Sequence, residues 1–521
     1  MTYPTKITYA VLSSLFLNLG GADTSFAQAG SLDPTFSTDG IVVQDFSTGL
    51  DDAHDIAIQS DGKILVAGRY FNGTNIDFTL FRFNTDGTLD LTYNSDGLAN
   101  ADLLGIDYTY ALEIQSDHKV VVVGCTEATP LSTNMCIGLV RFNSDGTLDT
   151  SFDGDGVVVT DLVGLAANAR DVRIQSDGKI VVAGSSNDGI TADYVTLRYN
   201  PDGSLDNTFD GDGMVITNLG VDTDIAEGLC IQSDGKIIVV GTTVLDFTHS
   251  FDIGMVRYNT DGSIDNTFDT DGIVIQDVAL DADAGTGIAL QTDGKILVSG
   301  SVTLSSDTDC GILRFNTDGS LDNTFDSDGI NSIDLFGVNQ EPLDLAVQAD
   351  GKIVLVGYHD DLVSDNDFLV ARFNTDGSAD ITFGTDGLVT TDITGTDKGD
   401  VGFGIVIQSD GKILATGYTD DGASNVQIVV ARYSDTGSVT NQTAEFYLEG
   451  FSIFPNPSTG EVNVQWKGKD NVALQVFNSL GQMVIEEQMT NSSAYVLSKK
   501  GVYFAKIQNG EKYCIQKIVI Q

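Results

Sequence analysis

Seven arginines recur at one fixed place in this chain, each between an apolar and an aromatic residue, as in Phe81-Arg82-Phe83. Asp90 and its equivalents follow six of them, and Asp33 stands at the start of the array. This pattern predicts a buried, hydrogen-bonded ion pair within each repeat or between neighbours. A ring of ligand-binding arginines is the alternative, but repetition in every copy favours a structural role. The arginines are Arg82, Arg141, Arg198, Arg257, Arg314, Arg372 and Arg432.

A second recurring motif, Asn84-x-Asp86-Gly87-x-x-Asp90, places side-chain oxygens at alternate positions before a glycine. In outline it resembles a calcium loop. The glutamate that ends the common calcium loop is absent, and Asn and Asp also form ordinary Asx turns. Asn84, Asp86 and Asp90 are therefore weak calcium candidates, and the sequence indicates no other cofactor.

Two of the five cysteines, Cys125 and Cys136, bracket a predicted loop between adjacent strands. In an exported chain such a pair can form a disulfide, with two free thiols as the alternative. Cys230 and Cys310 stand where other copies have apolar residues, so we expect them to be core thiols.

No catalytic or cofactor-binding residue can be named from the sequence. The four histidines fall at different repeat positions without paired spacing, which supports neither a zinc site nor a catalytic base. A serine-nucleophile elbow, a phosphate loop and a dinucleotide fingerprint are all absent. Carboxylates are so numerous that an acidic pair carries no information by itself.

The charge of the chain excludes several partners. The formal net charge is −49, from 75 acidic and 26 basic residues. Outside the tail, most basic residues occupy just two repeat positions, so no basic cluster remains to bind nucleic acid. An anionic membrane surface would also repel this chain. The last 76 residues, from Phe446, carry seven Lys and six acidic residues, and this change in charge density predicts a domain boundary near residue 445.

The N-terminus has the layout of a secretory signal peptide. Lys6 precedes an apolar run, Ile7–Leu19, and small residues follow up to Ala29. We assign residues 1–27 to the signal, with Ala27 or Ala29 as the last residue removed. The apolar run is too short to span a bilayer, and no later stretch is apolar enough to be a transmembrane segment.

The body of the chain is organised around a hairpin that occurs seven times, Ile58-Gln59-Ser60-Asp61-Gly62-Lys63-Ile64 in the first copy. Asp-Gly between β-branched runs predicts a two-residue primed turn, which needs positive φ. In the second copy His118 replaces the glycine, so we expect a strained or altered turn there.

Each repeat offers four strand-like runs, in the first copy Gly40–Asp45, His54–Gln59, Lys63–Gly68 and Phe78–Phe83. The runs are apolar at both parities, as in strands that are buried on both faces. Four-stranded units packed against copies of themselves predict an all-β fold, a seven-bladed β-propeller. Ile41–Asp45 should complete the last blade as its outer strand, and His54–Gln59 should be an innermost strand. A parallel β-solenoid is the competing architecture.

Three motifs recur together from residue 32 to about 437: Leu-Asp-x-Thr-Phe-x-x-Asp-Gly, Ile-Gln-Ser-Asp-Gly-Lys-Ile-Leu-Val-Ala-Gly and Arg-Phe-Asn-x-Asp-Gly. They resemble the delta-60 repeat of bacterial exported proteins, which assigns residues 28–437 to the propeller. A linker, 438–450, leads to the tail.

The tail, 451–521, contains short alternating runs that predict a small β-sandwich domain. It resembles the C-terminal sorting domain of type IX secretion in Bacteroidota, and this implies contact with the type IX machinery, passage across the outer membrane, and release or surface attachment. The resemblance rests on the final Lys-Ile-Val-Ile and on Pro455, Asn456, Pro457, Gly460, Gly501 and Tyr503.

Repetition without a unique catalytic constellation predicts a non-enzymatic binding or adhesion scaffold for an extracellular glycan or protein. Two alternatives stay open: a propeller hydrolase or lyase that acts on polysaccharide, and a purely structural surface component. A cluster of non-repeated polar or aromatic residues on one rim would argue against the structural component.

Overall fold

A computed structural model describes most of the chain from residue 28 onward, and it divides the chain into two compact units, Met1–Ser438 and Val439–Gln521. The predicted signal peptide, 1–27, and most of the predicted linker lie outside the described residues. The described ranges are 28–435 and 451–520, without residues 48, 104, 128–133, 245–250, 279–281, 304–307, 334–337, 361–365, 395–398, 421–424, 455–457, 467–471, 479–482, 490–492, 498 and 510–511.

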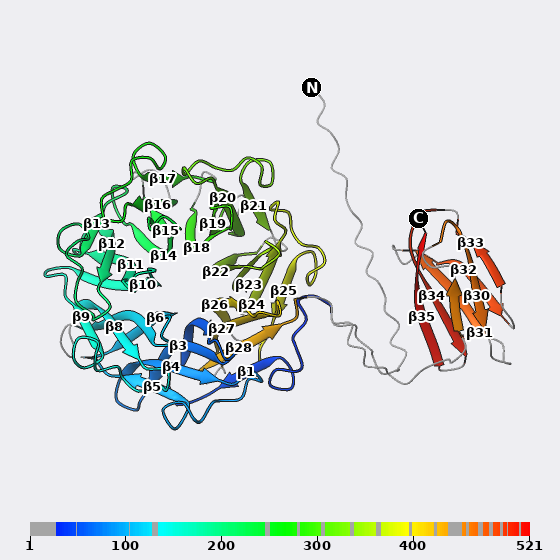
Figure 1. The fold of residues 1–521 in the computed structure, drawn as a ribbon, viewed down its shortest axis with the longest axis horizontal. Coiled ribbons are helices and arrows are strands. Elements are labelled where there is room, and N and C mark those ends of the chain that lie inside the picture. Colours follow the sequence, from blue (N-terminus) through cyan, green and yellow to red (C-terminus); the bar gives the residue numbers. More distant parts are fainter. Residues whose placement is uncertain are drawn as a thin grey trace. The chain divides into compact units, whose positions relative to one another are not determined.

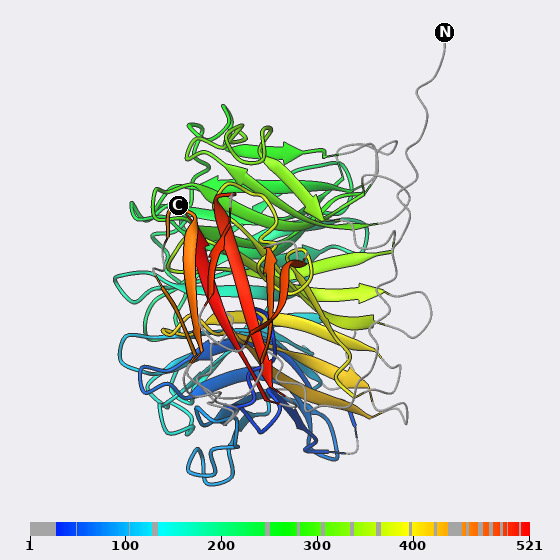
Figure 2. The same cartoon turned by 90° about the vertical axis from the view of Figure 1, so that its right-hand side faces the viewer.

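Seven four-stranded antiparallel sheets form the first unit and surround a common axis (Figure 1), which confirms the predicted seven-bladed propeller. The strands run approximately along this axis (Figure 2). Blade 1 consists of β2 (Asp52–Ile58), β3 (Ile64–Phe71), β4 (Ile76–Phe83) and β5 (Leu98–Ala101), from the innermost strand to the outermost.

The other blades repeat this order. Blade 2 has β6 (Asp107–Ile114), β7 (Val120–Glu127), β8 (Met135–Phe142) and β9 (Val157–Thr160); blade 3 has β10 (Ala166–Ile174), β11 (Ile180–Asn187), β12 (Ala192–Tyr199) and β13 (Met214–Thr217); blade 4 has β14 (Ile225–Ile231), β15 (Ile237–Thr243), β16 (Asp252–Tyr258) and β17 (Ile273–Gln276). Blade 5 has β18 (Ala284–Leu290), β19 (Ile296–Val302), β20 (Asp309–Phe315) and β21 (Ile330–Ile333); blade 6 has β22 (Gln340–Val347), β23 (Ile353–Asp360), β24 (Asn366–Phe373) and β25 (Leu388–Thr391); blade 7 has β26 (Asp400–Ile407), β27 (Ile413–Asp420) and β28 (Val426–Tyr433).

The N-terminal strand closes the ring. β1 (Ile41–Gln44) pairs antiparallel with β28, with Val42 opposite Val430, and so becomes the outer strand of blade 7 as predicted. Upstream, Leu32 bridges Tyr433, and buried Ala29 bridges Phe383 of blade 6. Signal cleavage after Ala27 would keep this last contact, and cleavage after Ala29 would remove it.

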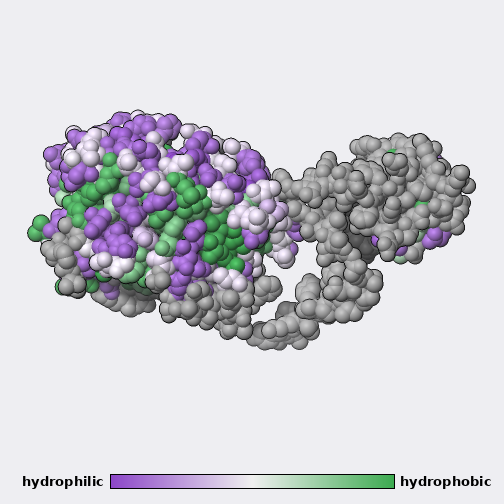
Figure 3. Space-filling view, turned by 90° about the horizontal axis from the view of Figure 1, so that it is seen from below, coloured by the Kyte–Doolittle hydropathy of each residue, from purple (hydrophilic) through white to green (hydrophobic). Residues whose placement is uncertain are grey.

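The hydrophobic core lies between the blades. One cluster, for example, combines Leu65 and Leu80 of blade 1 with Leu112 and Val122 of blade 2. Each such side chain contributes about 1.5–3 kcal/mol when fully buried. Both faces of each middle strand pack against neighbours, which explains why these strands are apolar at both parities. The outer face of the propeller is mainly hydrophilic, with hydrophobic patches between (Figure 3).

The repeated hairpin differs from the predicted two-residue turn. Gly62 N donates to Gln59 O at 2.8 Å, and Gln59 N donates to Lys63 O at 2.8 Å. Only Gly62 in this turn has a positive φ, +85°, whereas a primed turn requires two such residues or one at its first central position. The turn therefore matches a three-residue hairpin loop, a type I turn followed by a glycine bulge. As expected, His118 adopts a left-handed φ of +67° in the second copy.

The second unit contains two sheets around one core, the arrangement of a β-sandwich. The core includes Val464 and Leu474, one from each sheet. No helix in the described part of the chain could cross a membrane. One sheet contains β29 (Phe451–Phe454), β30 (Glu461–Trp466) and β33 (Ser493–Val496), and the other contains β31 (Val472–Asn478), β32 (Met483–Met489), β34 (Gly501–Asn509) and β35 (Lys512–Ile520).

Because a non-glycine residue in the left-handed region costs about 1–2 kcal/mol, His118→Gly should stabilise the propeller by about 1 kcal/mol. Chemical denaturation followed by circular dichroism measures this difference. The reciprocal variant, Gly178→His in blade 3, should destabilise by a similar amount, since Gly178 has a φ of +85° at the same position. Two variants with unchanged stability would contradict this account of the turn.

Candidate functional site

Each repeat arginine forms an ion pair that also includes the hairpin lysine. In blade 1, Asp90 Oδ2 accepts hydrogen bonds from Arg82 Nε and Lys63 Nζ, both at 2.7 Å. Asp90 Oδ1 accepts from the backbone and hydroxyl of Thr92. Burial alone would raise the pKa of Asp90, but Lys63, Thr92 and Arg82 outweigh burial and lower it.

The same arginine joins neighbouring blades. Arg82 Nη1 donates to Ser144 O of blade 2 at 2.9 Å, and its guanidinium lies over the Tyr93 ring at 4.3 Å. In blade 7, Arg432 and Lys412 bind Asp33, which comes from the N-terminal segment. All seven arginines are buried and occupied by protein partners, so the structure brings them into a framework and not into a ligand site.

The calcium-like motif forms a turn. Asp86 Oδ1 accepts from Thr88 N and Oγ1, at 3.0 and 2.7 Å, and Asn84 Nδ2 donates to Thr88 Oγ1. Asp90 is held by two cationic side chains. Protein donors therefore bind Oδ1 of Asp86 and both carboxylate oxygens of Asp90. Calcium binding by Asn84, Asp86 and Asp90 stays a prediction.

The suggested disulfide between Cys125 and Cys136 is absent, and both are free, buried thiols. Cys125 pairs with Ile137 across the two strands, whereas Cys136 pairs with Thr126. Because side chains alternate between the faces of a sheet, the two thiols project to opposite faces. Sequence spacing placed them near one another but could not give this register.

Three of the six sorting-motif residues are described. Gly460 and Gly501 have positive φ, +138° and +149°, and Tyr503 is buried with its hydroxyl donating to Lys499 O at 2.9 Å. Pro455, Asn456 and Pro457 lie outside the described residues.

A cavity of about 370 Å³ lies in the central channel and is lined by the innermost strands of all seven blades. Each of these strands contains a β-bulge, shown by a register shift such as that between Ala53 and Asp55. A bulge inserts an unpaired residue and redirects side chains. It therefore turns two consecutive positions of the strand toward the channel, the bulge residue and the one after it, which is glycine in three blades.

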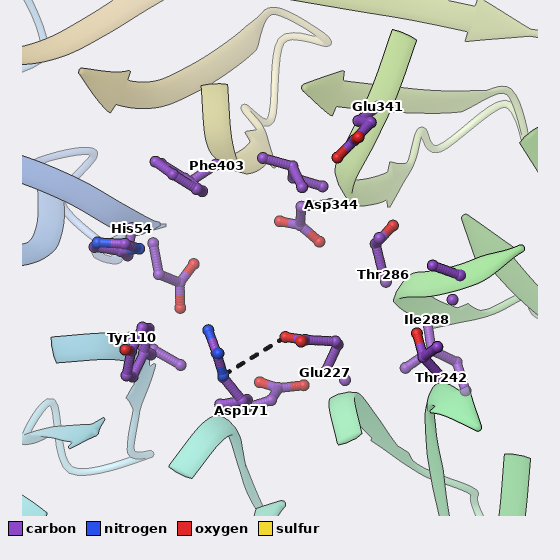
Figure 4. A pocket seen from close by; sticks show the side chains of 18 of the residues that line it. His54, Tyr110, Asp171, Glu227, Thr242, Thr286, Ile288, Glu341, Asp344 and Phe403 are labelled. Carbon is purple, nitrogen blue, oxygen red and sulfur yellow. Dashed lines mark ion pairs between the residues drawn. The ribbon is translucent and has the colours of Figure 1, made fainter. Parts of the chain in front are cut away.

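The residue at the bulge differs in every blade. Two and five residues downstream, the strand has an aliphatic residue and a glutamine in every copy, such as Ile56 and Gln59, so the bulge position varies within an otherwise repeated strand. Figure 4 shows several of these side chains pointing into the cavity. The seven bulge residues are His54, Tyr110, Arg170, Glu227, Thr286, Leu343 and Phe403.

Five bulge residues form a continuous arc. The His54 ring lies 4.6 Å from the Phe403 ring and 5.4 Å from the Tyr110 ring, between centroids. The Arg170 guanidinium lies 4.4 Å above Tyr110, and its Nε is 3.7 Å from Glu227 Oε2. His54 Nε2 and Arg170 Nε are buried and make no hydrogen bond, but each lies at ion-pair distance from a carboxylate, that of Asp52 and that of Glu227 respectively.

His54 is also near a buried carboxylate of its own strand. Its Nε2 lies 3.5 Å from Asp52 Oδ2, and Arg69 binds the same carboxylate. Burial raises the pKa of Asp52, but His54 and Arg69 outweigh it and lower that pKa. Asp52 therefore stays ionised at neutral pH.

The residue after the bulge is an aspartate in three blades, and it links each of these blades to the next. Asp55 accepts from Leu112 N at 2.8 Å, and Asp344 accepts from Ile405 N at 3.1 Å. The third, Asp171, accepts from Leu229 N at 2.7 Å. These carboxylates face the channel, yet each bonds the backbone of its neighbour.

Arg173 interacts electrostatically with all three of these carboxyl groups. Arg173 Nη1 lies 2.6 Å from Asp171 Oδ1 and 3.9 Å from Glu113 Oε2. Burial raises the pKa of Asp55 to about 8, with a contribution from Asp344, and burial raises the pKa of Asp344 to about 7. The carboxyl groups thus hold protons near neutral pH.

Sequence reasoning missed this channel site because it searched for repeated motifs. The useful signal was the opposite: the residue five positions before each anchor glutamine, such as Gln59, is different in all seven copies. The hairpin lysine was also missed as a partner of Asp90, although it recurs as regularly as the arginine.

Two family models match the chain. The model described as "Domain of unknown function (DUF5122) beta-propeller" matches seven times, and "Secretion system C-terminal sorting domain" matches residues 452–521. No curated protein matches the chain. The propeller matches cover 59–93, 115–152, 175–209, 232–268, 291–325, 348–383 and 408–439.

Solved structures with a similar fold are distant. Virginiamycin B lyase from Staphylococcus aureus is 12% identical, with a TM-score of 0.43, over 75% of this chain and 98% of the lyase. Polysaccharide lyase Uly1 is 10% identical, with a TM-score of 0.44, over 74% of this chain and 90% of that one. An α-L-arabinanase from Penicillium chrysogenum is 10% identical, with a TM-score of 0.41, over 74% and 99%. Likenesses this weak carry no argument about activity.

Fold and tail together define an exported β-propeller protein, which is secreted and then released or attached to the cell surface. In family terms, it is a DUF5122 repeat protein with seven repeats and a type IX sorting domain at its C-terminus.

Arg198→Ala should lower the free energy of unfolding by about 3–5 kcal/mol, because Asp206 would remain buried without its main partner. Lys179→Ala is the matched control, since Lys179 binds the same Asp206 oxygen but is 24% exposed. It should cost about 1 kcal/mol or less. Denaturant unfolding at neutral pH compares the two variants, and equal losses would contradict the framework role of the arginine.

A carboxyl whose pKa is higher in the folded state contributes stability at low pH and loses it as pH rises. Stability should therefore fall between about pH 5 and about pH 8, because folded Asp55 and Asp344 lose their protons there while unfolded carboxyls lose theirs near pH 4. Asp344→Ala, which copies Ala111 of blade 2, should flatten this slope. The exposed Asp212→Ala is the control, and an identical slope in both variants would refute the assignment.

Proposed function

We propose that this exported propeller is a binding scaffold whose ligand site is the bulge arc in the central channel. The main observation behind this proposal is that each of the seven blades has a bulge at the same position and a different side chain at that bulge. A purely structural role does not require this variety, because identical residues would give identical packing in every blade. Sites that combine few polar groups with aromatic walls, at about 300–1,000 Å³, are typical of small-molecule recognition.

The chemistry of the arc favours a neutral sugar. Aromatic faces at Phe403, His54 and Tyr110 suit the apolar face of a sugar ring, and the polar side chains of Glu227, Thr286 and Glu341 in the same lining suit its hydroxyl groups. The cavity contains five carboxyl groups against two guanidinium groups, and the chain as a whole has a net charge of −49. This negative charge would repel an acidic polysaccharide. The size of the cavity suits the end of a glycan chain.

A hydrolase is the second candidate, favoured by the raised pKa of Asp55, about 8, which would suit a general acid. Against it, both Asp55 and Asp344 accept backbone hydrogen bonds from the next blade, which gives them a structural task. A lyase acting on uronate polymers is less favoured, because the channel has no spare cation for the substrate carboxylate.

A glycan array probed with the full exported chain should show binding to neutral glycans and none to uronate-rich ones. Tyr110→Thr and Phe403→Thr borrow the residue that blade 5 carries at the same position, and each should weaken binding of a neutral array hit about tenfold through loss of the aromatic face. The exposed Leu91→Thr is the control. Calorimetry measures the affinities, and thermal unfolding checks that all variants are folded.

Absence of any neutral hit, or equal affinity in the Tyr110 and Leu91 variants, would contradict the proposed site. Release of reducing sugar from a bound glycan by the unmodified protein would establish the hydrolase in place of the scaffold.

A further inference from the structure

Three groups of three aspartates lie at junctions between blades. In the first, Asp77 begins β4 of blade 1, Asp102 follows β5, and Asp107 begins the innermost strand of blade 2. One carboxylate oxygen of each lies within 4.8 Å of the others. Similar groups join blade 4 to blade 5 and blade 6 to blade 7. They are Asp252, Asp277 and Asp283, and Asp367, Asp392 and Asp400.

The first group is buried and incompletely satisfied. Asp77 is 5% exposed and Asp107 is 0% exposed, while Asp102 is exposed to solvent. Asp107 Oδ2 accepts from Leu103 N and Asp77 Oδ2 from Asn72 Nδ2, but Oδ1 of both residues has no hydrogen-bond partner. A buried oxygen without a donor costs about 1–3 kcal/mol, and more when it is charged.

Like charges add to this cost. Burial, Asp102 and Asp77 raise the pKa of Asp107 to about 7, although Leu103 N and the nearby Thr126 oppose the rise. The Thr126 hydroxyl is not in hydrogen-bonding geometry with any group. In the third group, the fully buried Asp400 also has an unpartnered Oδ1.

The junction between blades 3 and 4 shows how the same place is satisfied without three acids. Asn218 stands where Asp102 stands in the first junction, and its Nδ2 donates to Asp193 Oδ1 at 2.8 Å. Asp224, which replaces Asp107, receives Thr243 Oγ1 at 2.5 Å on its Oδ1. At this junction, an amide thus replaces one carboxylate and donates a hydrogen bond to another. Where all three residues are carboxylates, no amide donor is present, and a cation could balance their negative charge.

We propose that the first and third aspartate groups each bind one divalent calcium ion. In the second group, both oxygens of Asp283 already accept backbone hydrogen bonds, from Thr303 N and Val278 N. Three carboxylates supply hard oxygen ligands with enough negative charge for such an ion, and water can complete the coordination through the exposed Asp102. Magnesium is less suited, because it demands near-ideal octahedral geometry and releases its water reluctantly.

The ions would also set the channel site. Each group includes the first or adjacent residue of an innermost strand, and the bulge residue follows three positions later: Tyr110 after Asp107, Thr286 after Asp283, and Phe403 after Asp400. A bound ion ties this strand to the third and fourth strands of the preceding blade. Calcium in the first and third groups would therefore fix the positions of Tyr110 and Phe403.

The test is calcium titration of the full exported chain after treatment with a chelator, by calorimetry, with thermal unfolding alongside. We expect two ions per chain and a melting temperature several degrees higher with calcium. Asp102→Asn, which copies Asn218, should bind one ion and stay folded, because the chain already tolerates this residue at the same position. Asn218→Asp should create a third site.

No calcium binding and no thermal shift at millimolar calcium would overturn the proposal, as would two ions in the Asp102 variant. Failure of Asn218→Asp to gain an ion would contradict the comparison between junctions. Tighter binding of magnesium than of calcium would refute the choice of ion. Stabilisation by lowered pH alone, with no calcium effect, would assign the centre of each group to a shared proton.

Discussion

Each four-stranded sheet of this protein has two apolar faces, and no single sheet can hide both from water. Stacking the sheets side by side covers every face except those at the ends, and bending the stack into a ring covers the ends as well. The closure by β1 in blade 7 satisfies this requirement, because it places the last uncovered faces against each other. The buried arginine, lysine and aspartate of each blade then hold neighbouring sheets at a fixed spacing, since the arginine bonds the next blade's backbone.

Much of the architecture could be predicted from the sequence because it repeats. Seven copies of the hairpin gave the blade number, and the unmatched run at Ile41–Gln44 gave the closing strand. Register could not be predicted: Cys125 and Cys136 are near in sequence, yet one step of alternation sends their thiols to opposite faces. The turn at Gly62 was assigned to the wrong class for a similar reason, because Asp-Gly fits both a primed turn and a glycine bulge.

The candidate site was less predictable because it depends on a backbone feature with no sequence signature of its own. The bulge at His54 and its equivalents lies in strands that otherwise read as ordinary alternating runs. Only the shifted pairing shows that two consecutive positions face the channel. Different positions of the repeat thus have different roles. The repeated positions determine the ring of blades, and the varied positions determine which side chains line the channel.

The order of the elements along the chain has a consequence for export. The first strand to be made, β1, waits for the last strand of the array, β28, and the sorting domain is made only after both. A chain that stops before β28 lacks both the partner of β1 and the sorting domain. Any chain that carries the sorting domain has therefore already been synthesised through β28. Only chains that contain every strand of the propeller can be recognised for export through this domain.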